Sequence, residues 1–261
     1  MRKGRTKDFE GSEHELRALT RELDELHHDV GLPATRDAVG HMGATSRRTF
    51  LLGAGAMAGG AALAAVGSGA LPALSGASAR RLSALGAATF PPAGLSGDLA
   101  VAAVAASLEN LAVFAYTAGL SAATAGKLGT VPPAVATFAT TVKGQHTQHA
   151  AAWNAVLKSH GKAPVTVTNP SLTPTVQSDF AKVTDVTGLA QLAVTLETIA
   201  AQTYQAETAK LKSTAAIALS SSIQPVEMQH IAILYYVLGL YPGAQTSAGT
   251  PLAFNPTSQA L

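Results

Sequence analysis

Two pairs of segments repeat glutamates and histidines at a spacing that could hold metal ions. Segments 107–116 and 195–204 each contain Leu-Glu, an aliphatic residue before Ala, and a Tyr seven residues after the Glu. Segments 146–151 and 227–232 each read Glu or His, any residue, Gln, His, any residue, Ala. On a helix, residues three or seven apart lie on one face. The repeat predicts metal ligation by His and carboxylate groups, and the candidate ligands are Glu109, His146, His149, Glu197, Glu227 and His230.

The composition makes this pattern informative, because acidic residues are scarce after the first third of the chain. Residues 80–261 carry nine basic and only seven acidic residues, and three of those seven belong to the repeat. The chain has no Cys, so a metal must be held by His and carboxylates. The net charge of +2 is too small to indicate a nucleic-acid surface. No Gly-rich phosphate loop or nucleophile motif indicates a nucleotide site or a hydrolase.

Four long segments of helical composition must position these residues. The Ala-rich, aromatic-poor sequence favours closely packed helices over a β-sandwich. The first two helices are expected to be joined by a short turn and the last two almost directly, whereas residues 162–184 are long enough to cross a bundle. Pro225 predicts a kink or one missing hydrogen bond in the last helix. The predicted fold is an all-α four-helix bundle over 96–240, with helices at about 96–126, 132–161, 185–212 and 213–239 and an irregular tail over 241–261.

At these residues the chain resembles the carboxylate-bridged di-iron proteins of the ferritin-like superfamily. Such proteins place one Glu on each of two helices and a Glu-x-x-His on each of the other two. The resemblance is closest to exported bacterial ferritin-like domains related to plant desiccation proteins. It implies two hairpins joined by a long crossover, and iron or manganese as the cofactor. It also implies single glutamates at Glu109 and Glu197, a full pair at Glu227 and His230, and a second His at His149.

One position departs from the family pattern. His146 stands where the second motif glutamate is expected, and an imidazole nitrogen cannot bridge two metals as a carboxylate does. A single metal ion or an asymmetric pair is therefore an alternative to a symmetric di-iron centre. Three functions stay open: a metal-dependent oxidoreductase or iron-handling protein that reacts with oxygen or peroxide, a metal-binding module without turnover, and a structural, stress-related bundle that has lost the full di-metal site.

The neighbouring residues have both functional and structural interpretations. Tyr116 and Tyr204 could donate hydrogen bonds to the ligands, take part in redox chemistry, or only pack in the core. Gln148 and Gln229 are weaker candidates for supporting the ligands. The histidines and glutamates themselves could be core groups satisfied by hydrogen bonds. Trp153 is predicted to be a core residue and His160 an exposed helix cap.

An export leader is predicted ahead of the bundle. Ser46-Arg47-Arg48-Thr49-Phe50-Leu51 resembles the twin-arginine export signal, and Ala77-Ser78-Ala79 fits the small-residue cleavage pattern. We therefore expect a leader over 1–79, a linker over 80–95, and export by the twin-arginine machinery to the periplasm or cell envelope. Residues 51–74 are long enough to span a bilayer, so an uncleaved membrane anchor is the alternative.

The leader contains a further helical pattern before its arginines. Ser12 and Glu15 form a capping box, and leucines then recur at steps of three and four, which predicts an amphipathic helix over 12–30. This helix either orders only on contact or docks a chaperone or another partner before export. His27 and His28 are adjacent, so they do not share a face, and no metal role is assigned to them.

Overall fold

The computed structural model describes residues 12–31, 91–92 and 94–240, and every regular element within these ranges is helical. The elements are α1 (Glu13–Leu26), the π-helical turn η1 (His27–Gly31), α4 (Asp98–Thr124), α5 (Pro133–Ser159), α6 (Thr173–Phe180), α7 (Val186–Thr208) and α8 (Thr214–Val237). The all-α prediction is confirmed. The twin-arginine motif, the 51–74 segment, the cleavage pattern at 77–79 and the tail over 241–261 lie outside the described residues.

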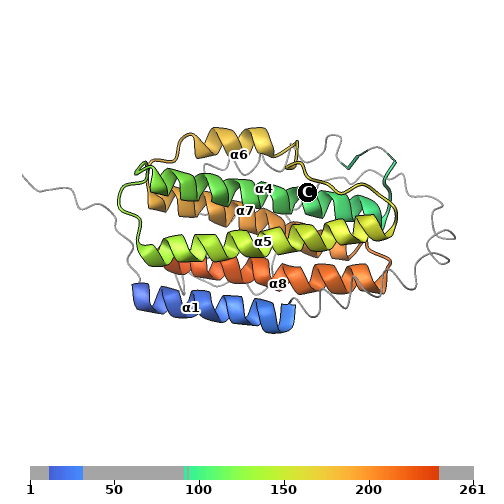
Figure 1. Ribbon diagram of the computed structural model, residues 1–261, viewed down its shortest axis with the longest axis horizontal. Helices are drawn as coiled ribbons and strands as arrows, with labels where there is room; N and C mark the ends of the chain where they lie inside the picture. The colour runs from blue at the N-terminus through green and yellow to red at the C-terminus, as the bar shows by residue number, and fades with distance from the viewer. Residues whose placement is uncertain (1–11, 32–90, 93, 241–261) are drawn as a thin grey trace, which may run out of the picture.

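Helices α4, α5, α7 and α8 form the bundle, and each predicted helix has its counterpart within a few residues at either end (Figure 1). Helix α4 packs along α5, and α7 packs along α8. The two hairpins are joined by the long crossover between α5 and α7, as predicted. Helix α8 continues through Pro225, which has no N–H group and so leaves one helical hydrogen bond unmade.

The crossover contains the short helix α6, which the sequence pattern did not predict. Its buried Val176 and the preceding N-cap residue, Leu172, pack into an apolar cluster with residues of α4 and α7. Two asparagines hold the segment before α6 against the bundle. The side chain of Asn154 accepts a hydrogen bond from Val165 N (2.7 Å) and donates one to Val165 O (3.0 Å). Asn110 donates to the same oxygen. These bonds satisfy backbone groups of a segment that has no ladder of its own.

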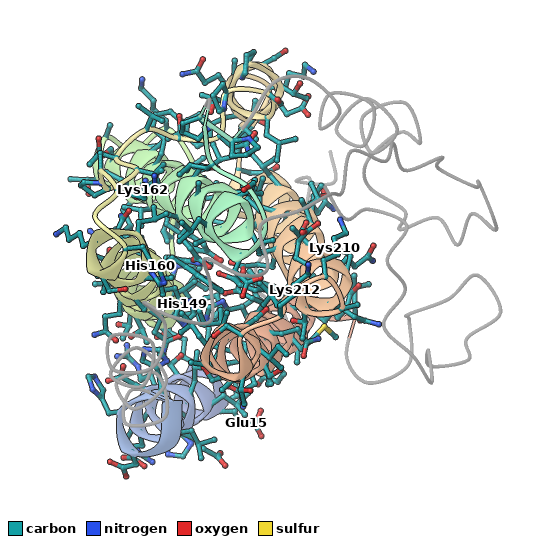
Figure 2. The ribbon with its side chains drawn as sticks, turned by 90° about the vertical axis from the view of Figure 1, so that its right-hand side faces the viewer. Glu15, His149, His160, Lys162, Lys210 and Lys212 are labelled. Carbon is teal, nitrogen blue, oxygen red and sulfur yellow. The ribbon has the colours of Figure 1, made fainter. Side chains whose placement is uncertain are left out.

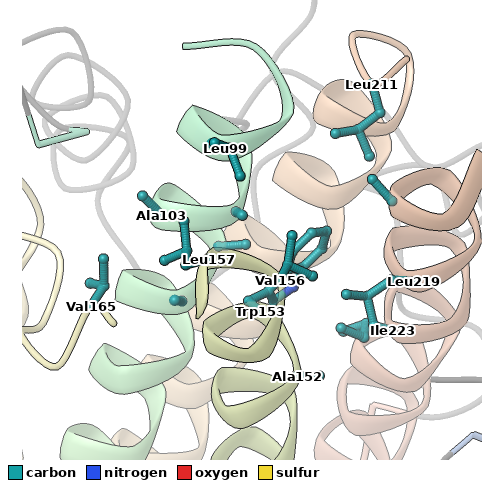
Figure 3. Close-up of a cluster of buried hydrophobic side chains, with 14 of the residues drawn as sticks. Leu99, Ala103, Ala152, Trp153, Val156, Leu157, Val165, Leu211, Leu219 and Ile223 are labelled. Carbon is teal, nitrogen blue, oxygen red and sulfur yellow. The ribbon is translucent and has the colours of Figure 1, made fainter. Parts of the chain in front are cut away.

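The core at one end of the bundle surrounds Trp153, which is fully buried as predicted (Figure 3). Leu99 of α4 and Leu219 and Ile223 of α8 pack in the same cluster. Helix α4 contributes mainly alanines there, and their small side chains let its neighbours approach closely. Helix α4 is also the one described helix that is long and apolar enough to cross a membrane, and 61% of its most apolar window is buried inside the bundle.

Helix α1 lies along α5 and α8, on the opposite side of the bundle from α6 (Figures 1 and 2). Leu16 and Leu23 are buried in a cluster with residues of α5 and α8. Ser12 caps the helix by accepting from Glu15 N (3.4 Å), and the hydroxyl of Tyr236 accepts from Ser12 N (2.8 Å). The sequence predicts this helix, but its packing against the bundle is visible only in the structure.

Candidate metal centre

The six predicted ligands converge inside the bundle, each no more than 2% exposed. Their donor atoms form two groups, and the atoms of each group lie within 4.8 Å of one another. His146 and Glu227 belong to both groups, so the two possible metal positions are adjacent and share these two residues. The groups are Glu109, His146, His149 and Glu227, and His146, Glu197, Glu227 and His230.

The two single glutamates are held by tyrosines from each other's helices. The hydroxyl of Tyr116 on α4 donates to Glu197 on α7 (2.6 Å), and the hydroxyl of Tyr204 on α7 donates to Glu109 on α4. In each helix the Tyr comes seven residues after the Glu, so this reciprocal pairing is what antiparallel helices require. The two Tyr–Glu hydrogen bonds thus form an approximate two-fold arrangement, in which each tyrosine fixes a carboxylate of the other helix.

The remaining four candidate ligands come from α5 and α8, two from each helix. His149 Nδ1 lies 3.2 Å from Glu227 Oε1, and the rings of His146 and His230 are 5.1 Å apart. Because the residues of each helix are three apart, one turn aims both at the centre. The spacing seen in the sequence is therefore sufficient to bring all four side chains to one interhelical position.

His146 occupies the middle of the cluster. Its Nδ1 lies 2.7 Å from Glu109 Oε2 and its Nε2 lies 3.2 Å from Glu197 Oε1, so both nitrogens face carboxylates. Burial alone would lower the pKa of His146, but the charges of Glu197 and Glu227 and the hydrogen bonds to carboxylates outweigh it and raise that pKa well above its usual value. This raised pKa favours the imidazolium form of His146, in which both nitrogens can donate to the glutamates.

The same balance raises the pKa values of the other two histidines of the cluster. For His149, burial lowers the pKa, but the nearby carboxylates of Glu109 and Glu227 outweigh it and raise that pKa to about 9. The pKa of His230 is raised, chiefly by Glu197. Conversely, the pKa of Glu109 falls to about 2, because His149 and the hydrogen bond with His146 outweigh its burial. The metal-free cluster thus offsets carboxylate charge with imidazolium charge.

Metal fits this cluster because some of its buried donors lack hydrogen bonds. Neither nitrogen of His149 and neither carboxylate oxygen of Glu227 has a hydrogen-bond partner, although both side chains are buried. Buried polar atoms without partners cost about 1–3 kcal/mol each. Imidazole nitrogens and carboxylate oxygens are ligands that iron and manganese accept. These ligand-type atoms without hydrogen bonds, on His149 and Glu227, are the observation that best supports metal binding.

Further residues hold the ligands in place, and sequence reasoning found only some of them. Trp153 is more than core packing, since its Nε1 donates to the hydroxyl of Tyr204 (2.9 Å). Gln145, which the sequence analysis missed, is buried and accepts from His230 Nε2 (2.7 Å). Its position four residues before His149, on the same face, was the available signal.

In the described part of the chain, Gln148 and Gln229 do not hydrogen-bond to the six candidate ligands, and His160 is less exposed than predicted. Gln148 accepts from His27 Nε2 (2.6 Å) rather than from one of the six ligands. No hydrogen bond joins Gln229, a half-buried residue, to any of those six described residues. His160 does cap α5, but it is half-buried rather than exposed, because its Nδ1 turns back to Val156 O (2.9 Å).

A small cavity adjoins the cluster on the side covered by the crossover. It has a volume of about 20 Å³ and is lined by Glu109, His146 and Glu197 together with apolar residues that include Leu172. This volume accommodates one water-sized molecule. Tyr116 also lines an apolar cavity of about 60 Å³ between the bundle helices.

Comparison with known proteins agrees with this geometry. A family model described as a ferritin-like domain matches residues 97–240, which is more than half of the chain and covers all four bundle helices and the crossover. No curated protein and no solved structure matches the chain. On the strength of this family match, this chain belongs to the ferritin-like domain family.

Proposed function

We propose that the protein binds iron or manganese between its four helices and acts as an oxidoreductase toward oxygen or peroxide, or in iron handling. The observation that carries the proposal is the buried ligand set with unpaired donors on His149 and Glu227. Bound iron or manganese would supply one-electron redox chemistry that no side chain of the cluster offers.

The ligand set favours two unequal metal positions. Glu227 belongs to both groups and carries two free carboxylate oxygens, so it is the residue placed to bridge. His146 also belongs to both groups, but an imidazole nitrogen serves one metal at a time. Three carboxylates compensate two divalent ions only in part, so the site is better matched to divalent than to trivalent pairs. We therefore propose an asymmetric pair or a single tightly held ion.

The protein's own contribution is orientation and exclusion of bulk water. Tyr116 and Tyr204 each fix one oxygen of a ligand carboxylate, which leaves the other oxygen directed at the centre. The pKa values of both tyrosines are raised well above normal, by burial first and then by the nearby glutamates. They stay protonated at neutral pH and act as hydrogen-bond donors.

Metal analysis of matched variants tests this proposal. Glu197→Gln removes a buried ligand charge of α7, whereas Glu207→Gln changes a Glu of the same helix that pairs with Lys210 outside the cluster. We expect purified E197Q protein to lose at least half of its bound metal, and E207Q to keep the wild-type content. Mass spectrometry for metals on the full chain provides the measurement. Equal metal content in both variants would remove the cluster as the binding site.

A second candidate function is a structural bundle that holds no metal. It is favoured by His146, whose two nitrogens face Glu109 and Glu197. A protonated His146 ring would supply the positive charge that a metal ion otherwise brings to these carboxylates. If the protein remains metal-free after purification from cells grown with iron and manganese, and titration with either ion leaves its melting temperature unchanged, this second function replaces the first.

We also propose that the protein acts outside the cytoplasmic membrane, on the basis of the twin-arginine motif. Changing Arg47 and Arg48 together to Lys should leave the chain in the cytoplasm at its full mass, because the export machinery reads both guanidinium groups. Cell fractionation with mass measurement tests this, and changing Arg80 and Arg81 to Lys provides the control pair. Export of the Arg47/Arg48 variant at the wild-type level would refute twin-arginine transport. An exported wild-type chain of full mass would instead favour the anchor over 51–74.

A further inference from the structure

One buried histidine lies outside the six-residue cluster, at the end of the N-terminal helix α1. His27 follows α1 at the start of η1 and is only 3% exposed. Its ring lies 5.2 Å from the ring of His149, in an edge-on arrangement at 62°. A histidine far ahead of the bundle in sequence thus lies beside a predicted metal ligand.

The hydrogen bonds of His27 determine which of its nitrogens is free. Its Nε2 lies 2.6 Å from the side-chain oxygen of Gln148, and an amide oxygen can only accept. Nε2 therefore carries the hydrogen, and in the neutral ring Nδ1 keeps a lone pair. That Nδ1 is buried and has no hydrogen-bond partner.

His149 presents the complementary group. Its Nδ1 faces the carboxylates, at 3.2 Å from Glu227 and 3.6 Å from Glu109, so this nitrogen is the one directed at the centre. Its Nε2 is buried and has no partner either. A histidine that ligates metal through one nitrogen normally donates the other N–H to an acceptor. The Nδ1 of His27 is an acceptor of that kind beside the same ring, although the two nitrogens are not hydrogen-bonded to each other in this structure.

We propose that α1 is a fifth helix that closes the metal centre, and that His27 positions the ligand His149 by accepting from its Nε2–H. The inference rests on the metal-binding function proposed above. It assigns His27 a positioning role and not that of a ligand.

The attachment of α1 supports a role in closure. Leu16 and Leu23 are buried against α5 and α8, the two helices that carry the histidines of the cluster. The hydroxyl of Tyr236 on α8 also donates to the carboxylate of Glu15. Because α1 precedes the twin-arginine motif, the predicted cleavage after Ala79 would remove His27 together with the leader. The centre is then closed while the leader is attached and becomes more accessible when the leader is lost.

Substitution of His27 in the full chain tests the positioning role, with His28 as the matched control because it is adjacent and exposed. We expect His27→Ala to weaken manganese binding about 10- to 100-fold, the usual effect of losing such a partner, and His28→Ala to have no effect. His27→Asn, whose side-chain oxygen can accept, should recover part of the loss. The absorption spectrum of the cobalt(II)-loaded chain should change in His27→Ala and not in His28→Ala.

A second variant tests closure separately. Changing Leu16 and Leu23 together to Asp should detach α1 and speed manganese loss to excess chelator at least tenfold, and adding His27→Ala to it should have no further effect. If the wild-type chain holds manganese and His27→Ala holds it equally well with an unchanged cobalt spectrum, the positioning role is wrong while the metal site stands. If the double Asp variant releases manganese at the wild-type rate, closure by α1 is wrong. A wild-type chain that binds no metal would refute the proposed function itself.

Discussion

Changing His146 to Glu is expected to make folding of the bundle depend on metal. In the metal-free chain this imidazolium lies between Glu109 and Glu197, at 2.7 and 3.2 Å. The substitution removes that cation and adds a fourth buried carboxylate. Breaking a buried ion pair by removing one partner costs about 3–5 kcal/mol, out of a total stability of about 5–15 kcal/mol. The metal-free variant should therefore be less stable by about that amount, and unfolded if the wild-type stability lies at the lower end of that range.

With metal present, the same substitution should have the opposite effect. It gives α5 the Glu-x-x-His spacing that α8 already has, so four carboxylates can compensate two ions. We expect metal content to rise toward two ions per chain, and iron oxidation by oxygen to become faster because a fourth carboxylate stabilises the ferric product.

Urea unfolding with and without manganese, together with metal analysis, tests this prediction. His146→Gln is the control, since it removes the cation without adding a negative charge. It should lose less stability than His146→Glu and gain no second metal. A glutamate variant that is as stable as wild type without metal, and that binds no more metal, would show that His146 does not neutralise the cluster. The structural function would then be favoured.

Manganese binding is expected to tighten steeply as pH rises. A metal must displace the protons of the histidines, and the pKa of His149 is raised to about 9. Between pH 6 and pH 8, competition with the His149 proton alone strengthens binding roughly 100-fold, close to tenfold per pH unit. The raised pKa values of His146 and His230 act in the same direction. Calorimetry at several pH values measures how the manganese affinity changes with pH. Repeating it in buffers of different ionisation enthalpy measures the number of protons released on binding.

The stability of the metal-free chain should show the opposite trend. The pKa of His149 rises from 6.5 to about 9 on folding, so its contribution of about 3 kcal/mol is fully present below pH 6.5 and is lost as pH rises through 9. The pKa of Glu109 falls from 4.5 to about 2, so its contribution is present above pH 4.5 and is lost as pH falls through 2. Burial lowers the pKa of His27 from 6.5 to about 4, so stability also declines as pH falls from 6.5 to 4. Urea unfolding should therefore give highest stability near pH 6.5. A His149→Gln variant that keeps the alkaline loss unchanged would contradict this assignment.

The four helices and six candidate ligands follow from the sequence because they depend on local geometry. Residues three and seven apart share a helix face whatever surrounds them, and the scarcity of acidic residues makes Glu109, Glu197 and Glu227 conspicuous. The long segment between α5 and α7 likewise predicts the crossover. Helix α6 within it could not be predicted, since a helix of eight residues is stabilised by its packing against α4 and α7 rather than by its own sequence.

The tertiary structure decided which group supports which ligand. That Tyr116 fixes Glu197 rather than Glu109 depends on the antiparallel pairing of α4 and α7. Gln145 supports His230 across the bundle, whereas the more conspicuous Gln148 turns to His27. These contacts join residues that are tens to more than a hundred positions apart, and no local periodicity encodes them. Hydrogen bonds and charge balance in a buried site are set by how the helices pack, because packing determines the partner that each buried polar atom meets once water is excluded.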